Sequence, residues 1–188
     1  MRITGGEFRG RILAVPKSGA IRPTQDRVRE ALFSMLAPEI PGADVLDLFA
    51  GTGAVGIEAL SRGARHATFV DSDRRHLATL RENLRLLSPA DDRQATVLAD
   101  AYRWIASYSG SGFSIVFADP PYALGEERGY ASVLEALARR GVVREGGLFV
   151  AEMTAVQKAE DTPGWNLLRD RTYGKTRICV WRREGAGK

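Results

Sequence analysis

The sequence is poor in cysteine and contains no long apolar run. Cys179 is the single cysteine among 188 residues, so the chain forms no internal disulfide, and we expect a reducing, cytoplasmic compartment. No window holds about 18 consecutive apolar residues, so we expect no membrane span. Residues 1–13 lack the apolar core of a signal peptide. The run ICVW is typical of a strand, and Cys179 is expected to be a small buried core residue.

Charge is distributed unevenly along the chain. The formal net charge is +4, but residues 1–29 contain seven Lys or Arg and two acids, and residues 169–188 contain the same numbers. The segment between them is therefore net negative. Basic ends on an acidic body favour docking of an anionic macromolecule such as nucleic acid. Charged termini that serve only solubility are the alternative.

The first quarter of the sequence predicts a small β-arm followed by a helix. Glycines separate short β-prone runs within residues 1–21, which is typical of a hairpin. Thr24 is a suitable N-cap for the helix that follows, and Pro38 ends it. One face of this helix is apolar, through Val28, Ala31, Leu32, Met35 and Leu36.

From residue 44 onward, strand-like and helix-like runs alternate. The predicted parallel strands are 45–49, 67–71, 95–99, 114–118 and 147–152, and the predicted helices are 54–62, 74–87, 102–107 and 130–139. Two final strand-like runs, 166–171 and 176–182, flank Gly174 and predict an antiparallel hairpin. The expected fold is α/β: one Rossmann-like domain over residues 1–188, with a doubly wound, mostly parallel seven-stranded sheet and helices on both faces. Its ligands should bind at the carboxyl ends of the strands.

A glycine-rich turn follows the first strand of this pattern. Gly51, Gly53 and Gly56 form G-x-G-x-x-G between a strand and a helix, which permits a tight turn and close backbone approach to a ligand. Asp71 ends the next strand, and a carboxylate there can accept hydrogen bonds from ribose hydroxyls. The pattern predicts a nucleoside cofactor, and a sharp turn beside a surface acid is the alternative.

Two further acids decide which nucleoside is favoured. A dinucleotide places its pyrophosphate at the helix N-terminus, where Asp47, four residues before Gly51, would repel it. Asp47 better suits a cofactor with a cationic amine, such as S-adenosylmethionine. Asp100 follows the third strand and can accept a hydrogen bond from an adenine amino group, cap the next helix, or do both.

The most specific motif is Asp119-Pro120-Pro121-Tyr122, at the end of the fourth strand. Proline fixes φ and lacks an N–H group, so the Asp119 carboxylate and a prolyl carbonyl can both accept from one NH₂ group. Two acceptors orient the lone pair of that nitrogen and stabilise the positive charge that grows as it attacks a sulfonium methyl. Tyr122 offers a face on which a planar base can stack. The alternative is a proline-rich turn after a buried strand.

These residues resemble class I methyltransferases with an [Asn/Asp]-Pro-Pro-[Tyr/Phe] motif, and more closely the RsmD family of 16S rRNA guanine-N2 methyltransferases. The matching runs are RITGGEFRGR, RPTQDRVREALF, LDLFAGTGAVGIEALSRGA and VFADPPY. The resemblance implies the exocyclic N2 of guanine 966 as acceptor and places Thr24 beside the cofactor. The sequence departs from the family where Asp71 replaces a common Glu and Asp100 stands where Asn also occurs; both keep an acceptor.

Together, residues and resemblance predict three groups of site residues. The expected cofactor-binding residues are Thr24, Asp47, Phe49, Gly51, Gly53, Gly56, Asp71 and Asp100. The expected catalytic residues are Asp119, Pro120, Pro121 and Tyr122, and the expected RNA-binding residues are Arg2, Arg9, Arg11 and Arg22. The expected cofactor is S-adenosylmethionine, without a metal. The expected partner is 16S rRNA or the small ribosomal subunit, not a membrane, and the protein is expected to be a monomer.

Three other functions share part of this pattern. A DNA or RNA adenine-N6 methyltransferase would use the same catalytic residues, although its usual target-recognition region has little room in 188 residues. A nicotinamide-dependent oxidoreductase would share the glycine turn but has no need of the Asp-Pro-Pro-Tyr motif. A non-catalytic RNA-binding module would explain the basic ends only.

Overall fold

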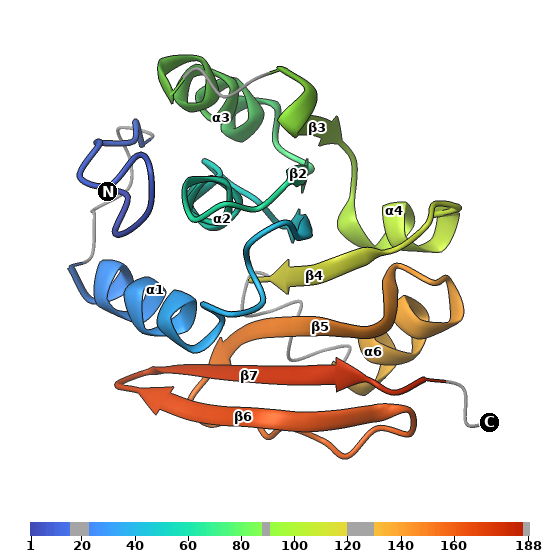
Figure 1. Ribbon diagram of the computed structural model, residues 1–188. Coiled ribbons are helices and arrows are strands. Elements are labelled where there is room, and N and C mark those ends of the chain that lie inside the picture. The colour runs from blue at the N-terminus through green and yellow to red at the C-terminus, as the bar shows by residue number, and fades with distance from the viewer. Residues whose placement is uncertain (16–22, 88–90, 120–129, 186–188) are drawn as a thin grey trace. The chain divides into compact units, whose positions relative to one another are not determined.

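The computed structural model describes residues 1–15, 23–87, 91–119 and 130–185 (Figure 1). The chain divides into two compact units, Met1–Asp100 and Ala101–Lys188. Within the described residues, no helix is both long enough and apolar enough to cross a membrane.

The first unit is a three-stranded parallel sheet with helices packed against it. Its elements are α1 (Pro23–Met35), β1 (Asp44–Leu48), α2 (Ala54–Ser61), β2 (His66–Asp71), α3 (Arg74–Leu87), the short 3-10 helix η1 (Asp91–Arg93) and β3 (Gln94–Leu98). β2 pairs with β1 from His66 to Val70 and with β3 from Ala67 to Asp71, in both cases parallel. The predicted leucine face of α3 is confirmed, because Leu77, Leu80, Leu84 and Leu87 are all buried. These leucines pack in one cluster with apolar residues of α2 and β2.

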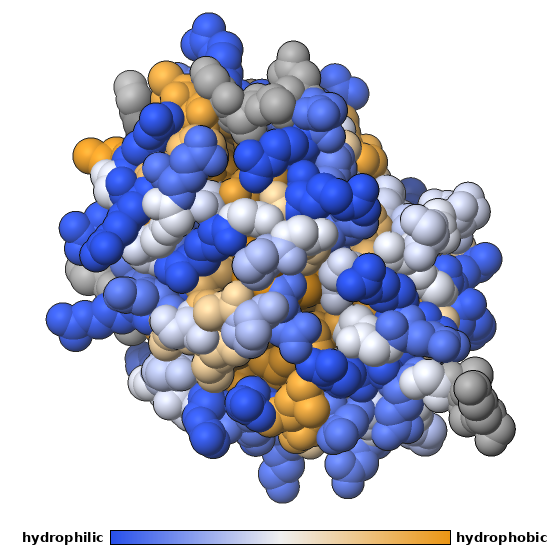
Figure 2. Space-filling model, viewed as in Figure 1, coloured by the Kyte–Doolittle hydropathy of each residue, from blue (hydrophilic) through white to orange (hydrophobic). Residues whose placement is uncertain are grey.

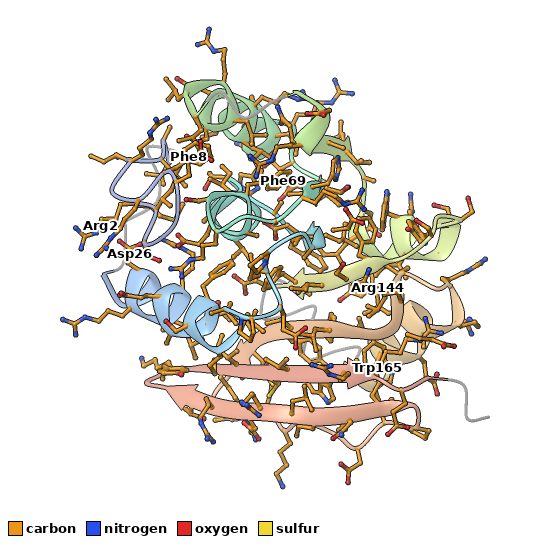
Figure 3. All side chains as sticks on the ribbon, viewed as in Figure 1. Arg2, Phe8, Asp26, Phe69, Arg144 and Trp165 are labelled. Atoms are coloured by element: carbon orange, nitrogen blue, oxygen red, sulfur yellow. The ribbon has the colours of Figure 1, made fainter. Side chains whose placement is uncertain are left out.

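The N-terminal segment, residues 1–15, packs onto this unit. It forms one antiparallel bridge, between Arg2 and Ile12, and residues 16–21 of the predicted β-hairpin arm lie outside the described residues. Ile3, Phe8 and Leu13 are buried in the cluster shared by α2, β2 and α3, and Phe8 lies on the side that faces these helices (Figure 3). Burying each such side chain stabilises the fold by about 1.5–3 kcal/mol. The segment therefore takes its stability from the core of the first unit.

Buried polar groups of α2 fix this segment in place. Glu58 is fully buried and accepts hydrogen bonds from the Thr4 amide (2.8 Å) and the Thr4 hydroxyl (2.7 Å). Its carboxylate also pairs with Arg62 (2.8 Å) and with Arg29 of α1 (3.4 Å). Ser61 donates to the Gly5 carbonyl (2.6 Å) and accepts from the Phe8 amide (2.9 Å). A buried carboxylate that lost these partners would be costly, so the contacts specify one position for the segment.

The second unit combines a parallel strand pair with an antiparallel C-terminal pair. Its elements are α4 (Ala101–Ser107), β4 (Phe113–Ala118), α6 (Tyr130–Arg139), β5 (Val143–Thr154), β6 (Trp165–Tyr173) and β7 (Thr176–Arg183). β4 runs parallel to β5, whereas β7 is antiparallel to both β5 and β6. The predicted hairpin of β6 and β7 is confirmed, and Gly174 in its turn has φ 62°.

The core of this second unit is aromatic, with Phe149 between Trp165 and Trp181 at ring distances of 6.3 and 5.8 Å. Cys179 is fully buried, and burial raises the pKa of its thiol to about 11, as fits a core residue and not a nucleophile.

The strand order is β3-β2-β1-β4-β5-β7-β6, a mostly parallel seven-stranded sheet with antiparallel strands at its C-terminal side. The predicted fold class is confirmed. In a sheet of this kind, ligands bind at the carboxyl ends of the parallel strands.

Hydrophilic side chains cover most of the face drawn in Figure 2, and apolar side chains reach it in several places. The large apolar residues that are most exposed are Ile12, Leu86, Leu98 and Val156.

Candidate cofactor-binding site

The glycine turn lies between the end of β1 and the start of α2. Phe49 has φ 60°, and it is the one non-glycine residue with positive φ in the described ranges. Gly51 and Gly53 follow with φ 55° and 84°, and the Gly53 amide donates to the Ala50 carbonyl at 2.8 Å. Three left-handed residues so close together are costly except where glycine removes the strain. Backbone strain at Phe49, beside two such glycines, is typical of a functional turn.

Two of the motif glycines are also required by their neighbours. A Cβ on Gly53 would lie 2.1 Å from Leu80 Cδ1, and a Cβ on Gly56 would lie 2.2 Å from Phe69 Cε1. Gly53 thus lets the turn approach α3, and Gly56 lets α2 approach the sheet. The third glycine of a dinucleotide-type fingerprint serves this same close packing of helix on strand.

Asp47 is a buried carboxyl group in β1, one residue before the strand ends. Only 4% of the residue is exposed, and its Oδ2 accepts a hydrogen bond from the Gly56 amide at 2.9 Å. Burial, together with the nearby charge of Asp71, raises the pKa of Asp47 to about 7, although the bond from Gly56 opposes this shift. The ionised form is poorly stabilised by the protein itself. A cation next to this carboxyl group would restore the ionised form.

Asp71 holds the glycine turn against the next strand. Its Oδ2 accepts from the Gly51 amide at 2.7 Å, across twenty residues of sequence. Its Oδ1 accepts from the Asp73 amide at 2.7 Å and lies 3.3 Å from His76 Nδ1. A carboxylate offers about four acceptor positions. Asp71 therefore has an architectural role in addition to the ribose contact that we predict for it.

Asp100 belongs to the same edge of the sheet. The Ala99 amide donates to the Asp71 carbonyl at 3.0 Å, so the chain leaving β3 runs beside the end of β2. Asp100 comes next, is exposed, and directly precedes α4, which is the position of an N-cap. Both predicted roles, cap and adenine acceptor, stay predictions.

Three carboxyl groups thus lie at the ends of β1, β2 and β3 in the first unit: Asp47, Asp71 and Asp100. This arrangement is unfavourable for a pyrophosphate, because like charges at close range repel strongly where water is excluded. It is favourable for a nucleoside that carries hydroxyl groups and a cationic amine. The geometry therefore supports the second kind of cofactor over a dinucleotide.

The remaining predicted residues fall in different places. Asp119 is exposed and directly follows β4 in the second unit. Pro120, Pro121, Tyr122 and Arg22 lie outside the described residues, as does the side chain of Thr24 in the first turn of α1. Their proposed roles stay predictions.

The arginines of the N-terminal segment are exposed, as an RNA contact requires. The Arg2 side chain is 72% exposed and lies 4.0 Å from Asp26, and Figure 3 shows the two side by side. The Arg11 guanidinium lies 5.1 Å from the centre of the Phe8 ring. Arg9 is also exposed. Their binding to RNA stays a prediction.

Two residues near the site were missed by the sequence analysis. His76, in the first turn of α3, lies against Asp71. Asn83, farther along α3, is fully buried and hydrogen-bonds to the glycine turn. Asn83 could have been found, since it stands three residues after Leu80 and four before Leu87, on the apolar face of the helix. A polar residue within such a face requires buried partners.

Within the described part of the chain, no group of three or more His, Cys, Asp or Glu side chains could hold a metal ion.

The fold, together with the glycine turn beside Asp47 and Asp71, defines the class of protein: the chain has the class I methyltransferase architecture. The family model "Conserved hypothetical protein 95" matches residues 1–182. The chain is 39% identical to Ribosomal RNA small subunit methyltransferase D of Escherichia coli strain K12, over 100% of this chain and 92% of that protein. It is 34% identical to the protein of the same name from Haemophilus influenzae, over 93% of this chain and 89% of the relative. The solved structure of yhhF from Escherichia coli is 37% identical, has a TM-score of 0.85 and covers 98% of each chain.

The chain belongs to this family, the RsmD family of methyltransferases.

Proposed function

We propose that the protein transfers a methyl group from S-adenosylmethionine to the exocyclic N2 of a guanine in small-subunit rRNA. The observation that supports this choice of cofactor is the glycine turn, which hydrogen-bonds to the buried carboxyl groups of Asp47 and Asp71. The acceptor class is supported by the name of relatives that align over nearly the whole chain. Guanine N2, and the 966 position, rest on the resemblance to the RsmD family.

The residues present fit the proposed cofactor. The left-handed glycines leave the backbone of the turn without side chains, and a Cβ on Gly51 would have only the Phe49 carbonyl oxygen within 4.0 Å, so a ligand can approach there. Asp47 offers a buried carboxyl group whose ionised form needs a cationic neighbour. In the proposed mode, Asp47 faces the amine of the methionine moiety, Asp71 accepts from the ribose hydroxyls and Asp100 accepts from the adenine amino group. When bound, S-adenosylmethionine supplies an activated methyl group on a sulfonium.

The chain's own task in the reaction is to orient the acceptor amine. In the proposed mechanism, the Asp119 carboxylate and the carbonyl of Pro120 or Pro121 accept both hydrogens of the guanine NH₂ group, so that its lone pair points at the methyl group. The same two oxygens stabilise the positive charge that develops on nitrogen. Tyr122 stacks on the base. As the N–C bond forms, the bond between the methyl group and the sulfonium would break and S-adenosylhomocysteine would leave, and the extra proton on the methylated nitrogen passes to solvent water. Neither a metal nor a nucleophilic side chain is needed.

We assign rRNA phosphate binding to the exposed arginines of the N-terminal segment, with Arg22 as a further contact. Arginine binds phosphate oxygens in a strong, often bidentate manner that does not depend on sequence.

A parallel transfer assay tests this proposal. Labelled S-adenosylmethionine is incubated with the protein and with undermethylated small ribosomal subunits, naked 16S rRNA or duplex DNA. We expect label in one or both rRNA substrates and none in DNA. Label in DNA alone would replace the proposal with a DNA methyltransferase, and no transfer to any of the three would refute it.

A further inference from the structure

Asn83 makes three hydrogen bonds to main-chain groups from two distant segments. Its Oδ1 accepts from the Ala14 amide at 2.7 Å, and its Nδ2 donates to the Ala14 carbonyl at 3.1 Å. The same Nδ2 donates to the Thr52 carbonyl at 3.0 Å. The side chain is fully buried, so these bonds form in a low-dielectric setting where an unpaired group is costly.

The two contacts have different effects on the backbone. Both polar groups of Ala14 are paired by one amide, as a neighbouring strand would pair them, which holds the end of the N-terminal segment to α3. Thr52 stands between Gly51 and Gly53 in the glycine turn. Because its carbonyl is held by Asn83, the orientation of the Thr52–Gly53 peptide plane is fixed, and with it the Gly53 amide that closes the turn on Ala50.

We infer that Asn83 is a positioning residue that couples the N-terminal segment to the cofactor turn. This inference rests on the proposed cofactor function of that turn. One amide serves both segments, so motion of Ala14 disturbs the group that holds Thr52. The N-terminal segment, proposed above as the RNA contact, then communicates with the cofactor site through α3 without touching the cofactor. By linkage, anything that orders one segment favours the ordered form of the other.

Two substitutions and their combination test the coupling. Asn83→Ala removes the clamp, and Phe8→Leu loosens the N-terminal segment at a buried residue six positions before Ala14. Affinity for S-adenosylhomocysteine is measured by calorimetry. Asn83→Ala should weaken affinity about 5- to 10-fold, which corresponds to roughly one lost hydrogen bond. Phe8→Leu should weaken it about 2- to 3-fold in the wild-type background and have no further effect in the Asn83→Ala background.

Leu36→Ala is the matched control. Leu36 is buried in the first unit, 3% exposed, and its substitution lowers the melting temperature without removing a bond to Ala14 or Thr52. Its affinity should equal that of the wild type. A purely structural role for Asn83 predicts that both variants change affinity only in proportion to their loss of stability, and that the effects of Phe8→Leu in the two backgrounds are the same.

Hydrogen exchange on the wild-type protein gives a readout that does not depend on a variant that folds. S-adenosylhomocysteine should slow exchange of the Ala14 amide more than that of the Leu36 amide, which bonds to Leu32 at 3.1 Å. Equal slowing at the two amides, or a folded Asn83→Ala protein with wild-type affinity, would overturn the clamp while leaving the proposed function intact. Failure of the wild-type protein to bind S-adenosylhomocysteine would instead refute the proposed function and the clamp with it.

Discussion

The substitution Asp47→Asn separates the effect of Asp47 on the stability of the cofactor-free protein from its effect on cofactor affinity. Asparagine has nearly the shape of aspartate, and its carbonyl can keep the hydrogen bond from the Gly56 amide. The substitution removes the charge and replaces the other carboxylate oxygen with an uncharged NH₂ group. In the folded protein the pKa of Asp47 lies at about 7, against an ordinary value of 3.8.

The raised pKa of Asp47 makes the stability of the folded protein depend on pH. An acid whose pKa is raised by folding binds its proton more tightly in the folded state, so the free energy of unfolding falls as pH rises between about 4 and 7. Each pKa unit corresponds to 1.36 kcal/mol, so ionised Asp47 destabilises the cofactor-free protein by up to about 4 kcal/mol above pH 7. Asp47→Asn removes this penalty. We therefore expect the variant without cofactor to be more stable than wild type at pH 8, and the two proteins to converge near pH 4.

Cofactor affinity should change in the opposite direction. The proposed cationic amine loses its carboxylate partner, a charge-assisted contact of about 1.5–3 kcal/mol, so affinity for S-adenosylhomocysteine should fall roughly 10- to 100-fold. Urea unfolding at pH 4 and pH 8 gives the stability, and calorimetry gives the affinity. A variant that is less stable at pH 8 would refute the raised pKa, and unchanged affinity would refute the contact with the amine.

Three further outcomes are expected. Asp119→Ala should raise the activation free energy of methyl transfer by about 3–4 kcal/mol, which slows single-turnover transfer, while cofactor affinity stays unchanged. Asp119→Asn, which keeps an acceptor oxygen, should retain more activity, and near-normal turnover of the alanine variant would remove Asp119 from the mechanism. Asp71→Ala should weaken cofactor affinity roughly 10- to 100-fold and also lower the melting temperature, because the Gly51 amide loses its acceptor. An unchanged dissociation constant would leave Asp71 with its architectural role alone. Replacing Arg2, Arg9 and Arg11 with Ala should flatten the log–log salt dependence of RNA binding by about two units if all three contact phosphate, with unchanged cofactor affinity; a folded triple variant with the wild-type slope would transfer the role to the basic C-terminal hairpin.

The fold was predictable wherever burial imposes a period on the sequence. The leucine face of α3 gave bounds identical to those observed, Arg74–Leu87, because four leucines recur at helical spacing against one cluster. β5 is longer than predicted, beginning at Val143 and not at residue 147, because Arg144, Glu145 and Gly146 are exposed and carry no apolar signal.

The N-terminal segment was harder to predict. Its glycines suggested a hairpin, but its position is set by Glu58 and Ser61, more than fifty residues away in sequence. A local pattern cannot show which buried carboxylate will accept from Thr4. Within the described residues, the segment forms one antiparallel bridge, between Arg2 and Ile12.

Part of the cofactor site was likewise predictable from the sequence, and part was not. The strand-end acids and glycines were predictable because the parallel sheet brings the ends of consecutive strands to one edge. What the sequence could not show is that Asp47 and Asp71 also hold the turn itself, through the Gly56 and Gly51 amides. Asn83 was not predicted, although a polar residue within the leucine face of α3 indicates a buried polar contact.

Identification of the methylated nucleoside tests the proposed function most directly. Small-subunit rRNA is methylated by the wild-type protein, digested to nucleosides and analysed by mass spectrometry, with the Asp119→Ala variant as the control. The proposed function predicts N2-methylguanosine in the wild-type digest and its loss with the variant. N6-methyladenosine in its place, or equal amounts of N2-methylguanosine from both proteins, would contradict it.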